Sequence, residues 1–150
     1  MDVCVMVSQP ARQHAYETAL AAQRAGLLHT FVTAIYRTGR GPWGPRTWRW
    51  APAALRRAVD RHLHRRWHPE LGSSRVRTLA RYHLIAAPLS RGPLAPLTRL
   101  ARWDAEQWAH WRFDAAVARL LPHLPGVQLV HAFEGAALAT FGAAQRLGLP

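Results

Sequence analysis

The chain has 150 residues, of which 49% are hydrophobic and 19% charged, and its formal net charge is +12 at pH 7. This length predicts one domain around one core, and the apolar content excludes general disorder. All 20 basic residues are arginine, as is typical of a GC-rich coding sequence, so the charge alone does not indicate nucleic-acid binding.

The first residues bear on the cellular compartment. Cys4 is the single cysteine and lies in an apolar run, where it acts as a small hydrophobic residue and favours a reducing compartment. Asp2 stands where a secretory signal carries positive charge, and no run approaches the roughly 18 apolar residues of a membrane span. We therefore expect a cytoplasmic protein and leave open a peripheral contact with the inner face of the membrane.

The N-terminal pattern predicts a βαβ unit. Residues 3–7 form a continuous apolar run, as in a parallel strand that is covered on both faces. Residues 14–25 read as a helix that ends at Gly26, and residues 27–35 as a second strand. The loop over residues 8–13 has no glycine, which excludes a dinucleotide fingerprint and a P-loop there.

The basic character is concentrated in residues 36–82, with 12 arginines against Asp60 and Glu70. Tryptophans alternate with arginines in a loop over residues 38–52, and residues 53–67 predict a basic amphipathic helix. Such a segment either lies on an anionic membrane surface or exposes its charges to solvent while its apolar stripe packs on the core. The candidates for an anionic-surface contact are Trp43, Arg46, Trp48, Arg49, Arg57 and Arg61.

Two segments connect this part to the C-terminal end. Residues 82–87 are compatible with a short strand, and residues 97–121 predict one long helix. Its Trp108 and Trp111 are expected in the core.

The last segment predicts a strand, a polar turn and a helix. Residues 127–130 are an apolar run, residues 131–135 are polar, and residues 135–147 follow a helical pattern that stops at Gly148. Leu138, Phe141, Ala144 and Leu147 would form one apolar side of this helix. In a parallel sheet the turns after the first and last strands share the carboxyl edge, where ligands bind. The free amides at the start of the helix would suit an anionic group there.

The two ends of the chain carry a resemblance to a known family. The motifs are HAFEG (131–135), ALATF (137–141) and AQRLG (144–148), and near the start RQH (12–14) and AGLL (25–28) before FVT (31–33). They resemble the N-terminal half of glycosyltransferases of the two-domain GT-B type, family 4.

The resemblance implies a fold and an activity. The fold class would be α/β, a Rossmann-like parallel sheet with flanking helices that forms the N-terminal half of a GT-B architecture. Residues 1–150 would be one incomplete acceptor-side domain, with residues 36–82 as a basic insertion. The full enzyme would move a sugar from a nucleotide-sugar donor to a sugar or lipid-linked acceptor. The C-terminal donor-binding domain of that family would then lie outside this chain, so the chain alone is expected to hold no cofactor and to be inactive.

The resemblance also places candidate residues in the acceptor cleft, which are Gln13, His14, His131, Glu134 and Gly135. Gln13 and His14 either contact the acceptor or only cap helix amides. Glu134 either orients a sugar hydroxyl or only favours the helix dipole. No catalytic residue is assigned.

The same residues allow one alternative function and argue against two others. The main alternative is a non-enzymatic basic α/β module that binds anionic lipid or nucleic acid through residues 36–82; the absence of a known motif makes nucleic acid the less favoured ligand. A metal site is not expected, because His62 and His64 do not share a helix face and no carboxylate set completes a site. A hydrolase is excluded, since GxSxG is absent and Cys4 lies inside a strand.

Overall fold

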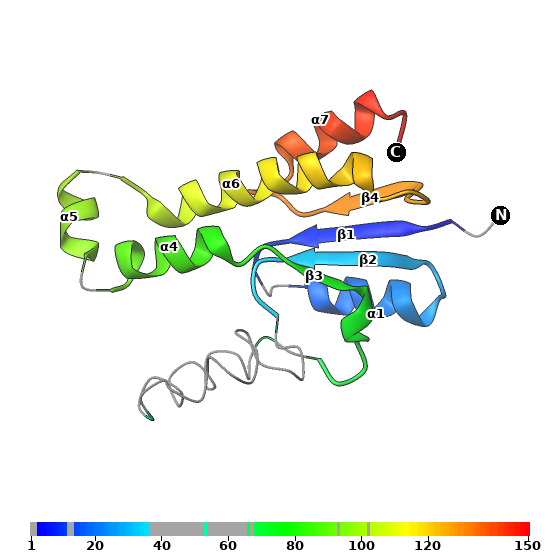
Figure 1. The fold of residues 1–150 in the computed structure, drawn as a ribbon, viewed down its shortest axis with the longest axis horizontal. Coiled ribbons are helices and arrows are strands. Elements are labelled where there is room, and N and C mark those ends of the chain that lie inside the picture. The colour runs from blue at the N-terminus through cyan, green and yellow to red at the C-terminus, as the bar shows by residue number, and fades with distance from the viewer. Residues whose placement is uncertain are drawn as a thin grey trace.

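Four parallel strands form the centre of the protein, in the order β3-β2-β1-β4 (Figure 1). The strands are β1 (Val5–Gln9), β2 (Leu28–Thr33), β3 (Val76–Thr78) and β4 (Leu129–Ala132). This computed structural model describes residues 3–11, 14–36, 53, 66, 68–92, 94–101 and 103–150. The sheet and its flanking helices confirm the predicted α/β, Rossmann-like class.

Helices cover both faces of the sheet. They are α1 (Ala15–Arg24), α4 (Arg81–Ser90), α5 (Ala95–Leu100), α6 (Ala105–Leu120) and α7 (Leu138–Arg146), with short 3-10 turns at Ser73–Arg75 and Leu121–His123. α1 packs on one face, whereas α6 and α7 pack on the other. α4 runs beside α6, and both extend past the carboxyl ends of β1 and β2, with α5 at the far end (Figure 1).

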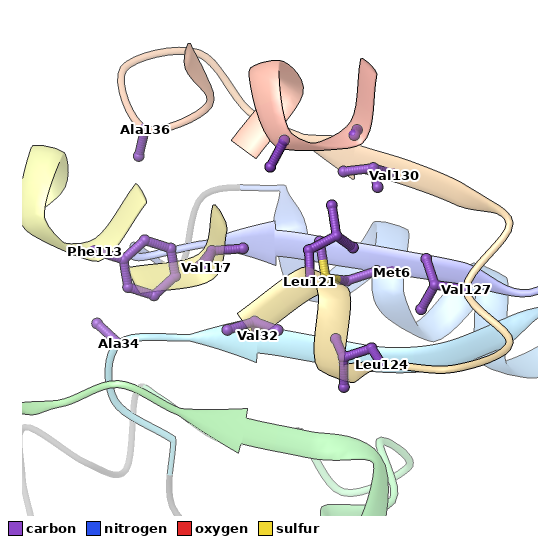
Figure 2. Packing of buried hydrophobic residues seen from close by; sticks show 12 residues of the cluster. Met6, Val32, Ala34, Phe113, Val117, Leu121, Leu124, Val127, Val130 and Ala136 are labelled. Carbon is purple, nitrogen blue, oxygen red and sulfur yellow. The ribbon is translucent and has the colours of Figure 1, made fainter. Parts of the chain in front are cut away.

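The central strand β1 supplies both cores because its side chains alternate between the two faces. Val7 packs with Tyr16 and Phe31 on the α1 side. Met6 lies on the opposite side, in a cluster with Phe113 (Figure 2). The cluster on that side also contains Val32, Ala34, Val117, Leu121, Leu124, Val127, Val130, Ala136, Ala143 and Ala144. Coverage on both faces explains why residues 5–7 of β1 are all apolar.

β1 continues two residues beyond the predicted end at residue 7. Ser8 and Gln9 were expected to break the strand, but they pair in register with Val32 and Thr33 of β2. Both are buried in the sheet. β2 pairs with both residues and β4 with Ser8, so side-chain polarity does not end the strand.

The predicted strand over residues 82–87 is wrong, because this segment belongs to helix α4. Tyr82 and Ala86, four residues apart, are the buried positions and pack against α6. β3 lies earlier in the chain, at Val76–Thr78, where it pairs with β2. The spacing of four was the signal for a helix.

The predicted helix over residues 97–121 is interrupted. Asp104 stands at the start of α6, where its carboxylate accepts hydrogen bonds from the backbone N–H groups of Glu106 and Gln107. This is an N-cap, which starts a new helix. Trp111 is 64% exposed, so its predicted place in the core is wrong, while Trp108 is half-buried.

Helix α7 ends as predicted but buries a different face. Gly148 has the left-handed φ of 68°, and Leu149 donates its N–H to the carbonyl of Ala144, which closes the helix. Leu138 is 89% exposed, and Phe141 and Leu147 are exposed too, so only Ala144 of the predicted apolar side is buried. The remaining buried residues are Thr140 and Ala143.

The predicted amphipathic helix over residues 53–67 lies outside the described residues except at positions 53 and 66. Also outside them lie the surface candidates Trp43, Arg46, Trp48, Arg49, Arg57 and Arg61. In the part of the chain that is described, no helix has the length and apolar character to cross a membrane.

Candidate functional site

The turns that follow β1 and β4 leave the sheet side by side. β1 and β4 are parallel neighbours, with Ser8 opposite Ala132. The two turns therefore start at the same carboxyl edge, which confirms the predicted arrangement. β1 pairs with β2 on its other side. The helix α1, which connects β1 to β2, lies on one face of the sheet, whereas α6, which precedes β4, lies on the other face. This is the topological switch point, where open α/β sheets form their ligand crevice.

The first turn places His14 at the start of α1. Its side chain is exposed and makes no capping hydrogen bond, so the alternative that His14 caps helix amides with its ring is wrong. Its backbone carbonyl accepts from the N–H and hydroxyl of Thr18. The ring of His14 is thus available at the edge. Gln13 lies outside the described residues.

The second turn is shorter than predicted, because β4 runs to Ala132 and includes His131. The exposed His131 ring stands edge-on to Phe133, with ring centroids 5.0 Å apart. Glu134 and Gly135 form the turn itself and are exposed. Gly135 has a φ of 82°, a left-handed conformation that other residues adopt only at a cost.

The start of helix α7 is already occupied by a carboxylate. Asp114 of α6 is 4% exposed, and its Oδ2 lies 2.7 Å from the backbone N of Ala139. Its Oδ1 lies 2.9 Å from the backbone N and 2.6 Å from the hydroxyl oxygen of Thr140. The prediction that these amides bind an anionic ligand is therefore wrong. The sequence signal was a lone acid beside Phe113, on the helix face that packs on the core.

Buried polar side chains lie at the strand ends under this edge. The hydroxyls of Ser8, in β1, and Thr33, at the end of β2, are buried and have no hydrogen-bond partner among the described residues. Gln9 is buried beside them at the end of β1. Buried polar groups are normally paired, so unpaired hydroxyls at a ligand-binding edge indicate groups that a bound molecule or water satisfies.

A histidine pair on α4 and α6 was not predicted. The rings of His83 and His110 have centroids 5.5 Å apart, and His83 stands edge-on to Phe113. Burial, then the nearby His110 and Arg66, lower the pKa of His83 to about 4. Both ring nitrogens of His83 are buried without a partner in the described structure.

Arg66 belongs to the same cluster. Its Nη1 is buried and has no partner among the described residues. Burial lowers the pKa of its guanidinium. Tyr16 and Glu106 act in the opposite direction and raise this pKa, whereas the nearby Arg91 lowers it further. Tyr16 donates its hydroxyl to the carbonyl of Ile35, just beyond the end of β2. The cluster therefore lies close to the carboxyl edge.

Two further features bear on possible binding sites. Within the described ranges, no three His, Cys, Asp or Glu side chains gather as ligands of a metal ion. A hollow of about 330 Å³ lies between the end of α4, α5 and the start of α6, lined by Ser90, Thr98, Arg99, Trp103, Asp104, Ala105 and Glu106. It contains none of the predicted cleft residues.

Comparison of the sequence with known protein families, curated proteins and solved structures gives no match. The resemblance to family 4 glycosyltransferases thus stays a prediction that rests on the motifs themselves.

Proposed function

We propose that this chain is the acceptor-side part of a glycosyltransferase that moves a sugar from a nucleotide-sugar donor to a sugar or lipid-linked acceptor. The observation that supports it is the meeting of the two motif-bearing turns at the switch point between β1 and β4. The resemblance rests on segments more than a hundred residues apart in sequence, and a shared ligand would require them to be adjacent.

The chemistry of the edge suits a polyhydroxylated acceptor. Glu134 and His131 supply an exposed acceptor and an exposed ring, and Ser8 and Thr33 supply buried hydroxyls without partners in the described part. Sugars are bound by such mixed donors and acceptors, because each hydroxyl both donates and accepts a hydrogen bond. Phe133 is a partly buried aromatic side chain next to them.

Glu134 is the residue best placed to select an acceptor hydroxyl. Its carboxylate is exposed in the turn that Gly135 shapes, and it makes no ion pair among the described residues. An ionised carboxylate accepts hydrogen bonds strongly, so Glu134 would orient the hydroxyl that receives the sugar. The alternative role in the helix dipole is less favoured, since Asp114 already serves the amides of α7.

The main alternative, a non-enzymatic basic module, depends on residues 36–82. Most of that segment lies outside the described residues, so the proposal rests on the edge of the sheet instead.

The proposal is tested by mapping ligand binding on the isotope-labelled chain. Mono- and disaccharides and their lipid-linked forms would be screened by amide chemical-shift changes. A true acceptor is expected to shift the signals of Ser8, His14 and residues 131–135. The proposal would be contradicted by shifts confined to the hollow beside α5, or by the absence of shifts with every acceptor tested.

Matched variants sharpen this test. Glu134→Gln is expected to weaken acceptor binding, whereas Glu70→Gln should not, because Glu70 pairs with Arg24 at the opposite end of α1. The chain alone should leave nucleotide-sugars intact, since the resembling enzymes bind the donor with a second domain. Turnover of a nucleotide-sugar by this chain would overturn the acceptor-side assignment.

A further inference from the structure

Three buried nitrogen atoms lie close to the carboxyl edge without explanation. They are Nδ1 and Nε2 of His83 and Nη1 of Arg66, all buried and without a hydrogen-bond partner among the described residues. A buried polar atom without a partner costs free energy, so such atoms are rare and usually belong to a site that a ligand or water completes. His110, half-buried beside His83, adds a third basic side chain at this place.

The acids around this cluster are committed elsewhere. Glu106 is the carboxylate that acts on Arg66, but both of its oxygens accept from Nη2 of Arg91, at 2.9 and 3.0 Å. Asp114, on α6 like His110, serves the start of α7. Among the described residues, the guanidinium of Arg66 therefore has no carboxylate of its own.

The donor pattern selects the kind of ligand. Arg66 offers N–H donors only and carries a fixed positive charge. At neutral pH His83 is uncharged, since its pKa is about 4, and its ring still offers one N–H. A cation is repelled by this set, and a neutral sugar leaves the charge uncompensated. An oxyanion satisfies both needs, because it supplies several acceptor oxygens and negative charge.

We propose that Arg66, His83 and His110 form a binding site for a phosphate-like oxyanion beside the carboxyl edge of the sheet. The site is distinct from the turns of β1 and β4 and does not depend on the transferase activity proposed above. Free phosphate and the phosphate of a lipid headgroup share this chemistry. The position of the site next to the crevice means that a phosphate held there would place an attached group at the edge.

The test follows the ring signals of the histidines by NMR during a pH titration. Without phosphate, His83 should titrate near pH 4. With saturating inorganic phosphate its midpoint should rise by about one unit or more, because a nearby anion favours the charged ring. Chloride at equal ionic strength serves as the control for screening. An unchanged midpoint in phosphate would overturn the proposal.

Variants assign the binding to these residues. Arg66→Gln and His83→Gln should each weaken phosphate binding about tenfold, as expected when a charge-assisted hydrogen bond is lost. Arg119→Gln and His123→Gln make the same chemical changes at exposed positions and should bind phosphate like the parent chain. Equal affinities in all four variants would refute the site. Arg66→Lys, which keeps the charge, should retain part of the binding and replaces Arg66→Gln if that variant does not fold.

A last arm distinguishes the source of the phosphate. Bicelles with phosphatidic acid are compared with neutral bicelles and with inorganic phosphate. If the natural ligand is a lipid, phosphatidic acid should move the His83 and His110 signals at a lower phosphate concentration than inorganic phosphate does. If the natural ligand is soluble, inorganic phosphate should be at least as effective as phosphatidic acid. Either result supports an oxyanion site, whereas no shift with phosphate or phosphatidic acid contradicts it.

Discussion

Asp114 shows how a single side chain connects two helices. It reaches from α6 to two backbone amides and one hydroxyl of α7, and its bonds to Thr140 are buried. Hydrogen bonds to a charged group contribute about 1.5–3 kcal/mol each at most sites, and a broken buried network leaves further groups unpaired. The position of α7 against the rest of the fold therefore depends strongly on this residue.

We predict that Asp114→Asn lowers the free energy of unfolding by about 2 kcal/mol or more, because an amide replaces one acceptor with a donor that faces N–H groups. Urea unfolding measures the change. Asp104→Asn is the matched control, since asparagine is as good an N-cap as aspartate and should change stability by only a few tenths of a kcal/mol. Equal losses in the two variants would contradict the role given to Asp114.

His83 makes stability depend on pH. The folded protein lowers its pKa from 6.5 to about 4 through burial, His110 and Arg66. Between these values the unfolded chain binds more protons than the folded one, so lowering the pH favours unfolding. We predict a fall in the free energy of unfolding from about pH 6.5 to 4, with a smaller slope in His83→Gln.

The midpoint of urea unfolding, recorded at several pH values, measures this slope. His123→Gln makes the same chemical change at an exposed position and serves as the control for the loss of a histidine. A His83→Gln chain with the full parent slope would show that another group is responsible.

At the level of elements, the end of each helix was easier to predict than the face that it buries. Gly26 and Gly148 have left-handed φ values, which the sequence indicated through glycine itself. Leu138 and Phe141 were expected on one apolar side of the helix, yet both are exposed and small residues of α7 lie inside. Helix α7 packs closely on α6 through Thr140 and the alanines, which periodicity of large residues does not reveal.

Substituting two glycines of this region by alanine should change the free energy of unfolding in opposite directions. Gly135→Ala is expected to destabilise by about 1 kcal/mol, because its φ of 82° is unfavourable for alanine although a Cβ would meet no atom within 4 Å. Gly142→Ala should stabilise by about 0.5–1 kcal/mol, since alanine favours the helix interior and its Cβ would lie 3.6 Å from the Arg146 side chain.

Thermal unfolding of the two variants tests this pair. Changes of the same sign would contradict either the left-handed turn at Gly135 or the helical position of Gly142.

For the whole molecule, the sequence predicted the class and the sheet arrangement but not the histidine cluster. Strands buried on both faces read as apolar runs, so β1, β2 and β4 were recognisable, and parallel pairing placed two turns together. His83 and Arg66 lie in segments whose local pattern was ambiguous or dominated by charge. Only the packing of α4 on α6 brings His83 and His110 together, and tertiary packing leaves no local signal for that.

The pairing of β1 has a consequence for the order of folding. β1 meets β2 after roughly 20 residues of chain but meets β4 only after roughly 120, and closing the longer loop costs about 1.5 kcal/mol more in chain entropy. We predict that β1, α1 and β2 form first and that β4 docks late. Pulse-labelled hydrogen exchange should protect Phe31 and Val32 earlier than Leu129, whose N–H donates to the carbonyl of Cys4 just before β1.

Simultaneous protection of both strand pairs would contradict this order. If β4 does dock last, the edge where the two turns meet exists only after the slowest step of folding. A partly folded chain would then hold a complete βαβ unit and still have no crevice, so ligand binding would report on the finished fold alone.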